Sequence, residues 1–152
     1  MSALRDPVQL LALGFGAGLS PVAPGTVGSL VGLAAALLAA RADTWLTATI
    51  TAVVVLAGWW ICAEGARRLG VHDHPAIVWD EIAGMMIAML AAPRGWAWAA
   101  LALVMFRVFD IVKPWPIREI DHAMRGGAGI ILDDVLAGIL AALGLLLVRS
   151  IT

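Results

Sequence analysis

The chain has 152 residues, of which 62% are hydrophobic and 14% charged, and its formal net charge is −1. This composition excludes an ordinary water-soluble domain, and the small net charge leaves no basic surface for nucleic acid. Cys62 is the single cysteine, which excludes an internal disulfide and a multi-cysteine metal site. We therefore expect an integral membrane protein, and without any linker or low-complexity stretch we expect residues 1–152 to form one domain.

The first apolar stretch, residues 8–40, is interrupted by a segment that contains Pro21 and Pro24. Because proline removes a backbone donor, a helix should end there and a second one should begin near Ser29, with Thr26 or Ser29 as its cap. An acidic residue precedes the first apolar run, and no small-residue cleavage site follows it. A removed signal peptide is therefore not expected.

Residues 45–63 carry no charge and are long enough to cross a bilayer, and residues 131–148 form a second apolar segment. Residues 82–92 and 96–109 are predicted to be two arms of a helical hairpin, each short for a full crossing. We expect crossings at 29–40, 45–63, 79–92, 96–109 and 131–148. The predicted fold is an all-α polytopic membrane bundle of about four to five apolar helices, some of them short or re-entrant.

This arrangement places the charged loops 64–81 and 110–130 on one side of the membrane. Tryptophans lie near the ends of the apolar segments, as in an interfacial aromatic belt. Seven basic residues fall on the loop side and three on the other: Arg5, Arg67, Arg68, Arg107, Lys113, Arg118 and Arg125 against Arg41, Arg94 and Arg149. The excess of positive charge favours a cytoplasmic location for the loop side.

Acidic residues are predicted near one water interface at three places in the chain. They are Asp80 with Glu81, Asp110, and Asp133 with Asp134, the last pair in the first turn of the segment 131–148. One carboxylate at a helix start can be a simple cap, but two adjacent negative charges at a membrane edge repel unless a cation neutralises them. A hard divalent ion such as Mg²⁺ prefers oxygen ligands, so a metal site is the favoured interpretation.

A second cluster of charges lies at the end of the segment 96–109. Arg107, Asp110 and Lys113 have the spacing of one stripe on a helix, which Pro114 and Pro116 should terminate. The stripe can be a local salt bridge with a lysine that matches the helix dipole. It can equally place an acidic metal ligand between two cations that bind phosphate, as phosphoryl transfer requires.

Two glycine patterns have both structural and functional interpretations. In the turn Pro24-Gly25-Thr26 the backbone amides at a helix start can bind an anion, although any capped turn fits the same description. Asp80 and Asp134 each precede a glycine by four residues, in the shared pattern D-x-[IL]-A-G. Such a glycine allows a neighbouring helix to approach the acid, and plain helix packing explains it equally well.

Other candidate sites are less favoured. Cys62 and Arg68 have the C-x5-R spacing of cysteine-dependent phosphatases, but the segment continues an apolar helix and Glu64 would repel phosphate. The pair His72 and His74 could bind a transition metal, although loop histidines are usually solvated. The glycines of residues 126–129 predict a flexible turn.

Four segments in order resemble the phosphatidylglycerophosphatase A family, a family of small bacterial membrane phosphatases. They are residues 19–30 (LSPVAPGTVGSL), 80–84 (DEIAG), 106–116 (FRVFDIVKPWP) and 126–138 (GGAGIILDDVLAG), which extend over most of the chain. The resemblance implies Mg²⁺-dependent hydrolysis of phosphatidylglycerophosphate to phosphatidylglycerol and phosphate at the cytoplasmic face of the bacterial inner membrane. It implies the lipid bilayer as a partner and leaves a homo-oligomer open.

The resemblance and the residues together suggest roles for the charged groups. The candidate metal ligands are Asp80, Glu81, Asp110, Asp133 and Asp134, and a catalytic role is expected for all of these except Asp133. Arg107, Lys113, Gly25 and Thr26 are expected to bind the substrate phosphate. Two rival interpretations are a small ion- or proton-coupled transport protein, which predicts acids at mid-span, and a structural subunit without an active site.

Overall fold

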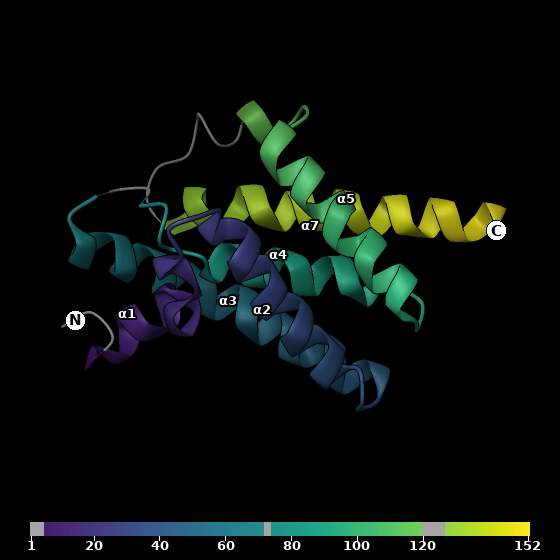
Figure 1. Ribbon diagram of the computed structural model, residues 1–152, viewed down its shortest axis with the longest axis horizontal. Coiled ribbons are helices and arrows are strands. Elements are labelled where there is room, and N and C mark those ends of the chain that lie inside the picture. Colours follow the sequence, from purple (N-terminus) through teal and green to yellow (C-terminus); the bar gives the residue numbers. More distant parts are fainter. Residues whose placement is uncertain (1–4, 72–73, 120–126) are drawn as a thin grey trace.

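The computed structural model describes residues 5–71, 74–119 and 127–152, and all the regular structure in these ranges is helical (Figure 1). The elements, in chain order, are α1 (Pro7–Ala12), the 3₁₀-helix η2 (Gly14–Leu19), α2 (Pro24–Ala39), α3 (Thr44–Leu69), α4 (Trp79–Leu90), α5 (Trp96–Val112) and α7 (Gly127–Ile151). The all-α prediction is confirmed over the described residues.

The long helices run back and forth along the molecule. Helices α2, α4 and α7 begin at the end of the bundle near the N-terminus, whereas α3 and α5 end there (Figure 1). Helices α3 and α7 are long and apolar enough to cross a membrane. Large apolar side chains lie on the outside of the bundle, among them Leu56 of α3 with 75% of its surface exposed. An apolar exterior of this kind suits a bilayer better than water.

The helix ends follow from local sequence. The Asp43 side chain accepts a hydrogen bond of 2.8 Å from the Leu46 amide at the start of α3, and Gly70 ends α3 in the left-handed conformation, with φ of 72°. Pro24 occupies the first turn of α2, where its missing N–H costs nothing. The residue before it, Ala23, is the N-cap, so the predicted capping of α2 by Thr26 or Ser29 is wrong. The Ser29 hydroxyl instead donates to the Gly25 carbonyl.

Helix α4 lies at the centre of the bundle and packs against α2, α3, α5 and α7. Its closest crossing is with α7, where a Cβ placed on Gly84 would stand 2.5 Å from the Asp134 carbonyl oxygen. On α7, a Cβ on Gly138 would stand 2.4 Å from the Gly84 carbonyl oxygen. The two glycines therefore let the backbones touch one turn beyond the acids, and Met85, Phe106 and Leu145 fill the core beside them.

Helix α7 begins earlier than the sequence predicts. It starts at Gly127, so Asp133 and Asp134 lie about two turns inside the helix rather than in its first turn. The described glycines of the predicted flexible turn, Gly127 and Gly129, are also helical. Their small size serves packing, since a Cβ on Gly127 would stand 2.4 Å from the Trp59 carbonyl oxygen of α3. Tertiary contact thus overrides the weak helix propensity of glycine.

Candidate active site

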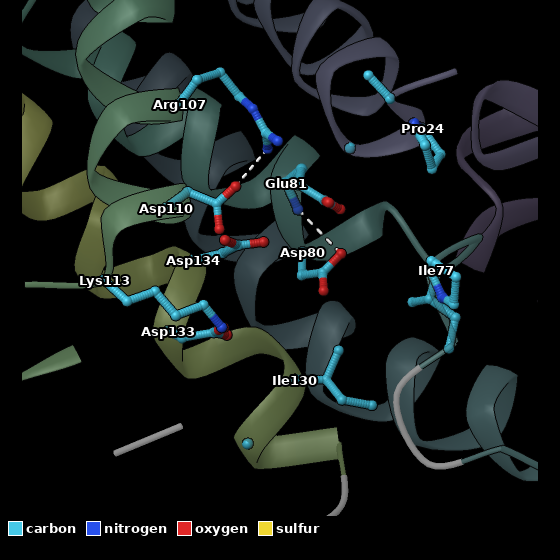
Figure 2. Close-up of a pocket in the computed structure, with 14 residues that line it drawn as sticks. Pro24, Ile77, Asp80, Glu81, Arg107, Asp110, Lys113, Ile130, Asp133 and Asp134 are labelled. Atoms are coloured by element: carbon cyan, nitrogen blue, oxygen red, sulfur yellow. Dashed lines mark hydrogen bonds and ion pairs between the residues drawn. The ribbon is translucent and has the colours of Figure 1, made fainter. Parts of the chain in front are cut away.

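A polar cavity of about 350 Å³ opens at the end of the bundle where α2, α4 and α7 begin and α5 ends (Figure 2). Eight of the nine sequence-predicted site residues line it. Helix α2 contributes Gly25, α4 contributes Asp80 and Glu81, and α7 contributes Asp133 and Asp134. Helix α5 contributes Arg107 and Asp110, and Lys113 directly follows α5. Three chain segments that carry the predicted acids thus converge on one cavity.

Three of the acids form a compact oxygen cluster. Asp80, Glu81 and Asp134 each offer a carboxylate oxygen, and these oxygens lie within 4.8 Å of one another. Asp80 and Asp134 are 8% and 3% exposed. Like charges buried this closely destabilise one another unless a cation or protons compensate them.

Two oxygens of the cluster favour the binding of a cation. Glu81 Oε2 and Asp134 Oδ1 are buried and accept no hydrogen bond from the described protein. A buried carboxylate oxygen without a donor is costly, and a bound ion would satisfy it. The donor set consists of oxygen alone, which matches a hard divalent ion such as Mg²⁺ rather than a softer transition metal. The cluster could therefore hold such an ion.

Two cations flank the acidic cluster. Arg107 of α5 forms an ion pair with Asp110 one turn further along the same helix, and Figure 2 shows its guanidinium lying near Glu81. The Arg107 Nε atom is buried and has no acceptor among the described residues. The Lys113 ammonium lies 2.6 Å from Asp133 Oδ2 of α7. The cavity thus combines an acidic centre with two positive groups at its wall, and the Nε–H of Arg107 remains available as a hydrogen-bond donor.

The start of α2 closes the cavity from the side of Pro24 (Figure 2). A Cβ on Gly25 would stand 2.4 Å from Glu81 Oε1 and 3.2 Å from both terminal nitrogens of Arg107. Only glycine therefore allows the backbone to approach these two charged groups. No side chain caps α2, so its first-turn amides and the positive end of its dipole remain for an anion.

The structure leaves Thr26 out of this cavity. Thr26 lines a separate apolar hollow beside α5. Sequence reasoning also missed the apolar wall of the cavity, where Ile77 and Ile130 lie (Figure 2). Nothing in the sequence distinguishes these two residues from other core residues, although Ile130 belongs to the segment that carries the family resemblance.

The less favoured candidates can be placed as well. Residues 62–68 belong to helix α3 and form no phosphate-binding loop, and Cys62 is fully buried. The prediction that this segment continues an apolar helix is confirmed. His72 and Asp73 lie outside the described residues. His74 accepts a hydrogen bond of 3.1 Å from the Ala76 amide in the turn before α4. The predicted acids gather at one end of the bundle, which argues against the transport interpretation.

Comparison with known proteins identifies relatives of the chain. A family model described as phosphatidylglycerophosphatase A matches residues 10–149. The chain is 43% identical over 140 residues to phosphatidylglycerophosphatase A of Escherichia coli K12, which covers 91% of this chain and 81% of that protein. It is 44% identical over 142 residues to the protein of the same name from Haemophilus influenzae, with 92% and 87% covered.

A third relative, from Bacteroides thetaiotaomicron, is 38% identical over 138 residues, which are 86% of each chain. Its name, phosphatidylinositol-3-phosphatase, is provisional. No solved structure matches the chain significantly. The family model spans nearly the whole chain, including every segment that lines the cavity. The chain belongs to the phosphatidylglycerophosphatase A family.

Proposed function

We propose that this protein removes the terminal phosphate of phosphatidylglycerophosphate by hydrolysis and depends on Mg²⁺ for this activity. One observation supports the proposal most directly. A cluster of buried carboxylates faces Arg107 and Lys113 across a single cavity at the end of an apolar bundle. Carboxylates that hold a metal beside cations that bind phosphate are the parts that phosphoryl transfer needs. The two relatives named phosphatidylglycerophosphatase A supply the identity of the lipid.

The charged residues of the cavity divide into two groups in this proposal. Asp80, Glu81 and Asp134 would hold Mg²⁺, which when bound stabilises negative charge on the phosphoryl oxygens. Arg107 and Lys113 bind the phosphate together with the first-turn amides at Gly25. Asp110 and Asp133 keep the two cations oriented through their ion pairs. As carboxylates of the same cavity, both also remain available as further ligands.

The reaction breaks the bond between phosphorus and the ester oxygen of the glycerol headgroup. A carboxylate of the cavity takes the proton of the attacking water, or else attacks phosphorus itself and is freed by water in a second step. The departing glycerol oxygen takes up a proton from water. Both routes end in phosphatidylglycerol and inorganic phosphate. Acid quenching of a reaction with ³²P-labelled substrate separates them, because only the second route leaves label on the protein.

The activity is tested with purified protein and phosphatidylglycerophosphate in detergent, with Mg²⁺ and with EDTA. We expect phosphate release with Mg²⁺, its loss in EDTA and its return when Mg²⁺ is restored. Phosphatidic acid and phosphatidylinositol 3-phosphate serve as competing substrates. Absence of phosphate release from phosphatidylglycerophosphate in every condition would refute the proposal, and a faster reaction with the inositol lipid would reassign its substrate.

The membrane arrangement forms part of the proposal. Residues 1–152 act as one domain in the bacterial inner membrane, with α2, α3, α4, α5 and α7 crossing it and the cavity facing the cytoplasm. Helix α4 has 12 residues, or about 18 Å, which is short for a bilayer core of about 30 Å. It is surrounded by the other four helices, so its ends need not reach the lipid surface.

The orientation can be measured with single cysteines in a Cys62→Ala background. Arg94, between α4 and α5, lies at the end opposite to the cavity, whereas Arg118 follows α5 at the cavity end. In intact cells an impermeant maleimide should label Arg94→Cys from outside and leave Arg118→Cys unlabelled. The reverse pattern would invert the proposed topology.

A further inference from the structure

An apolar groove of about 400 Å³ lies between the start of α2 and the outer face of α5. We call it the α2–α5 groove. The residues that matter for its role are Thr26 of α2 and, along α5, Val104, Arg107, Val108, Ile111 and Val112. On α5 these positions follow the helical repeat, so they form one continuous stripe. The apolar members are 50–70% exposed, which shows that no other part of the described chain covers them.

The groove adjoins the active-site cavity, although the two are distinct hollows. Arg107 lines both, and Thr26 of the groove directly follows Gly25 of the cavity. Two other apolar hollows among the described residues differ in this respect. One lies between α4 and α7 and includes Leu143, and another lies at the far end of α2 and α4. Neither has a lining residue in common with the cavity.

A lipid phosphate presents two chemically different parts to such a protein. Its headgroup is charged and needs the polar cavity, whereas its acyl chains gain by contact with apolar surface. On α5 the stripe has Arg107, which would bind the phosphate, between Val104 and Ile111, with Val104 nearer the middle of the helix. A phosphate held at Arg107 therefore leaves its acyl chains beside the apolar surface at Val104.

We propose that an acyl chain of the phospholipid substrate lies in the α2–α5 groove while its phosphate occupies the cavity. This inference rests on the proposed function and adds the route by which the substrate enters, sideways from the bilayer between α2 and α5. It also assigns Thr26 to the ester end of the acyl chain and not to the phosphate.

The test compares Val104→Trp with a matched control, Leu143→Trp. Val104 is 58% exposed in the α2–α5 groove, and Leu143 is 55% exposed in the hollow between α4 and α7. Each variant is assayed with dioleoyl and with dihexanoyl phosphatidylglycerophosphate, since the short chains reach only the start of the groove. The ratio of kcat/KM for the long lipid to that for the short one is the readout.

We expect Val104→Trp to lower this ratio about tenfold or more, because the indole ring fills the groove, and Leu143→Trp to keep the wild-type ratio. A wild-type ratio in Val104→Trp, or an equal fall in both variants, would overturn the proposed groove. Failure of the enzymatic function itself is seen separately, because the unaltered protein would then release no phosphate from either lipid.

A second measurement on the unaltered chain covers the case in which Val104→Trp does not fold. A phosphatidylglycerophosphate analogue with a photoreactive diazirine in one acyl chain is bound to the protein and irradiated. We expect crosslinks to concentrate in residues 103–112. Crosslinks concentrated in residues 139–146, or spread evenly over the apolar exterior, would overturn the proposal.

Discussion

The ammonium nitrogen of Lys113 lies 2.6 Å from Oδ2 of Asp133 and joins the end of α5 to α7. Lys113 ends α5 in the left-handed conformation, with φ of 46°, just before Pro114. It therefore leaves the helical stripe on which Arg107 and Asp110 form their own ion pair. Two cation–carboxylate pairs, one within a helix and one between helices, border the acidic cluster.

The pair between Lys113 and Asp133 allows two roles for the lysine to be separated. Lys113→Met removes the charge and keeps most of the side-chain volume, so we expect a fall in kcat/KM of about 10- to 100-fold if the ammonium binds phosphate. The double variant Lys113→Met with Asp133→Asn should be no more active than the single one. Recovery in the double variant would instead mean that Lys113 only neutralises Asp133.

The acidic cluster predicts opposite effects of Asp134→Asn on activity and on stability without metal. We expect the variant to lose at least about 100-fold in kcat and to show no increase in Tm when Mg²⁺ is added. In EDTA it should melt above the wild type, because one of three mutually repelling carboxylates has gone. Calorimetry with and without Mg²⁺ measures both effects.

Asp43→Asn is the matched control for this experiment. Asp43 is exposed, lies at the far end of the bundle and caps α3. Asparagine caps a helix about as well as aspartate, so activity and the Mg²⁺ effect on Tm should stay at wild-type values. A wild-type Mg²⁺ response in Asp134→Asn would remove that residue from the metal site.

Gly25→Ala tests the close approach of α2 to the charged groups. The new methyl group would stand 2.4 Å from Glu81 Oε1, so Glu81 and Arg107 must move. Misplacement of reacting groups by about 1 Å typically costs about 100-fold in rate. We therefore expect kcat to fall by about 100-fold while Tm changes by only a few degrees.

Gly144→Ala provides the comparison. Its methyl group would meet the flexible end of Met105, 2.2 Å away, which can turn aside. Activity should remain close to that of the wild type. Equal losses in Gly25→Ala and Gly144→Ala would show that the effect at Gly25 is general to helical glycines and unrelated to the cavity.

Gly84→Ala should lower the free energy of unfolding. Its methyl group would stand 2.5 Å from the Asp134 carbonyl and 2.6 Å from the Phe106 ring. Backbone and a fully buried ring cannot move aside, so we expect a destabilisation of about 1–3 kcal/mol. Thermal unfolding in detergent measures it, and a Tm equal to that of the wild type would contradict the described crossing of α4 and α7.

Cys62→Ala separates the carboxylate site from a cysteine nucleophile. Cys62 is fully buried in α3 and packs beside Ile77 and Ile130, so its loss leaves a small void and costs at most a few kcal/mol of stability. We expect the rate of phosphate release to stay near that of the wild type. Complete inactivation of a folded Cys62→Ala protein would contradict the proposed site.

The helical class, the helix ends before Pro21 and Pro114 and the residue types of the site follow from local sequence. Apolar runs of this length leave few alternatives, because unpaired backbone groups in hydrocarbon are too costly for any irregular segment. Doubled acids such as Asp133 and Asp134 stand out for the same reason, since charge is rare in such segments. These features are local and can be recognised one segment at a time.

Which of these residues meet depends on how the helices pack. Gly127 is helical and packs closely on α3, where its Cβ would stand 2.4 Å from the Trp59 carbonyl oxygen, and Asp133 and Asp134 lie about two turns inside α7. Thr26 and Gly25 are neighbours in sequence, yet the packing of α2 against α5 puts them in different cavities. The Lys113–Asp133 pair joins residues 20 positions apart. Such outcomes depend on how helices cross, and the crossing depends on many small contacts that no single segment contains.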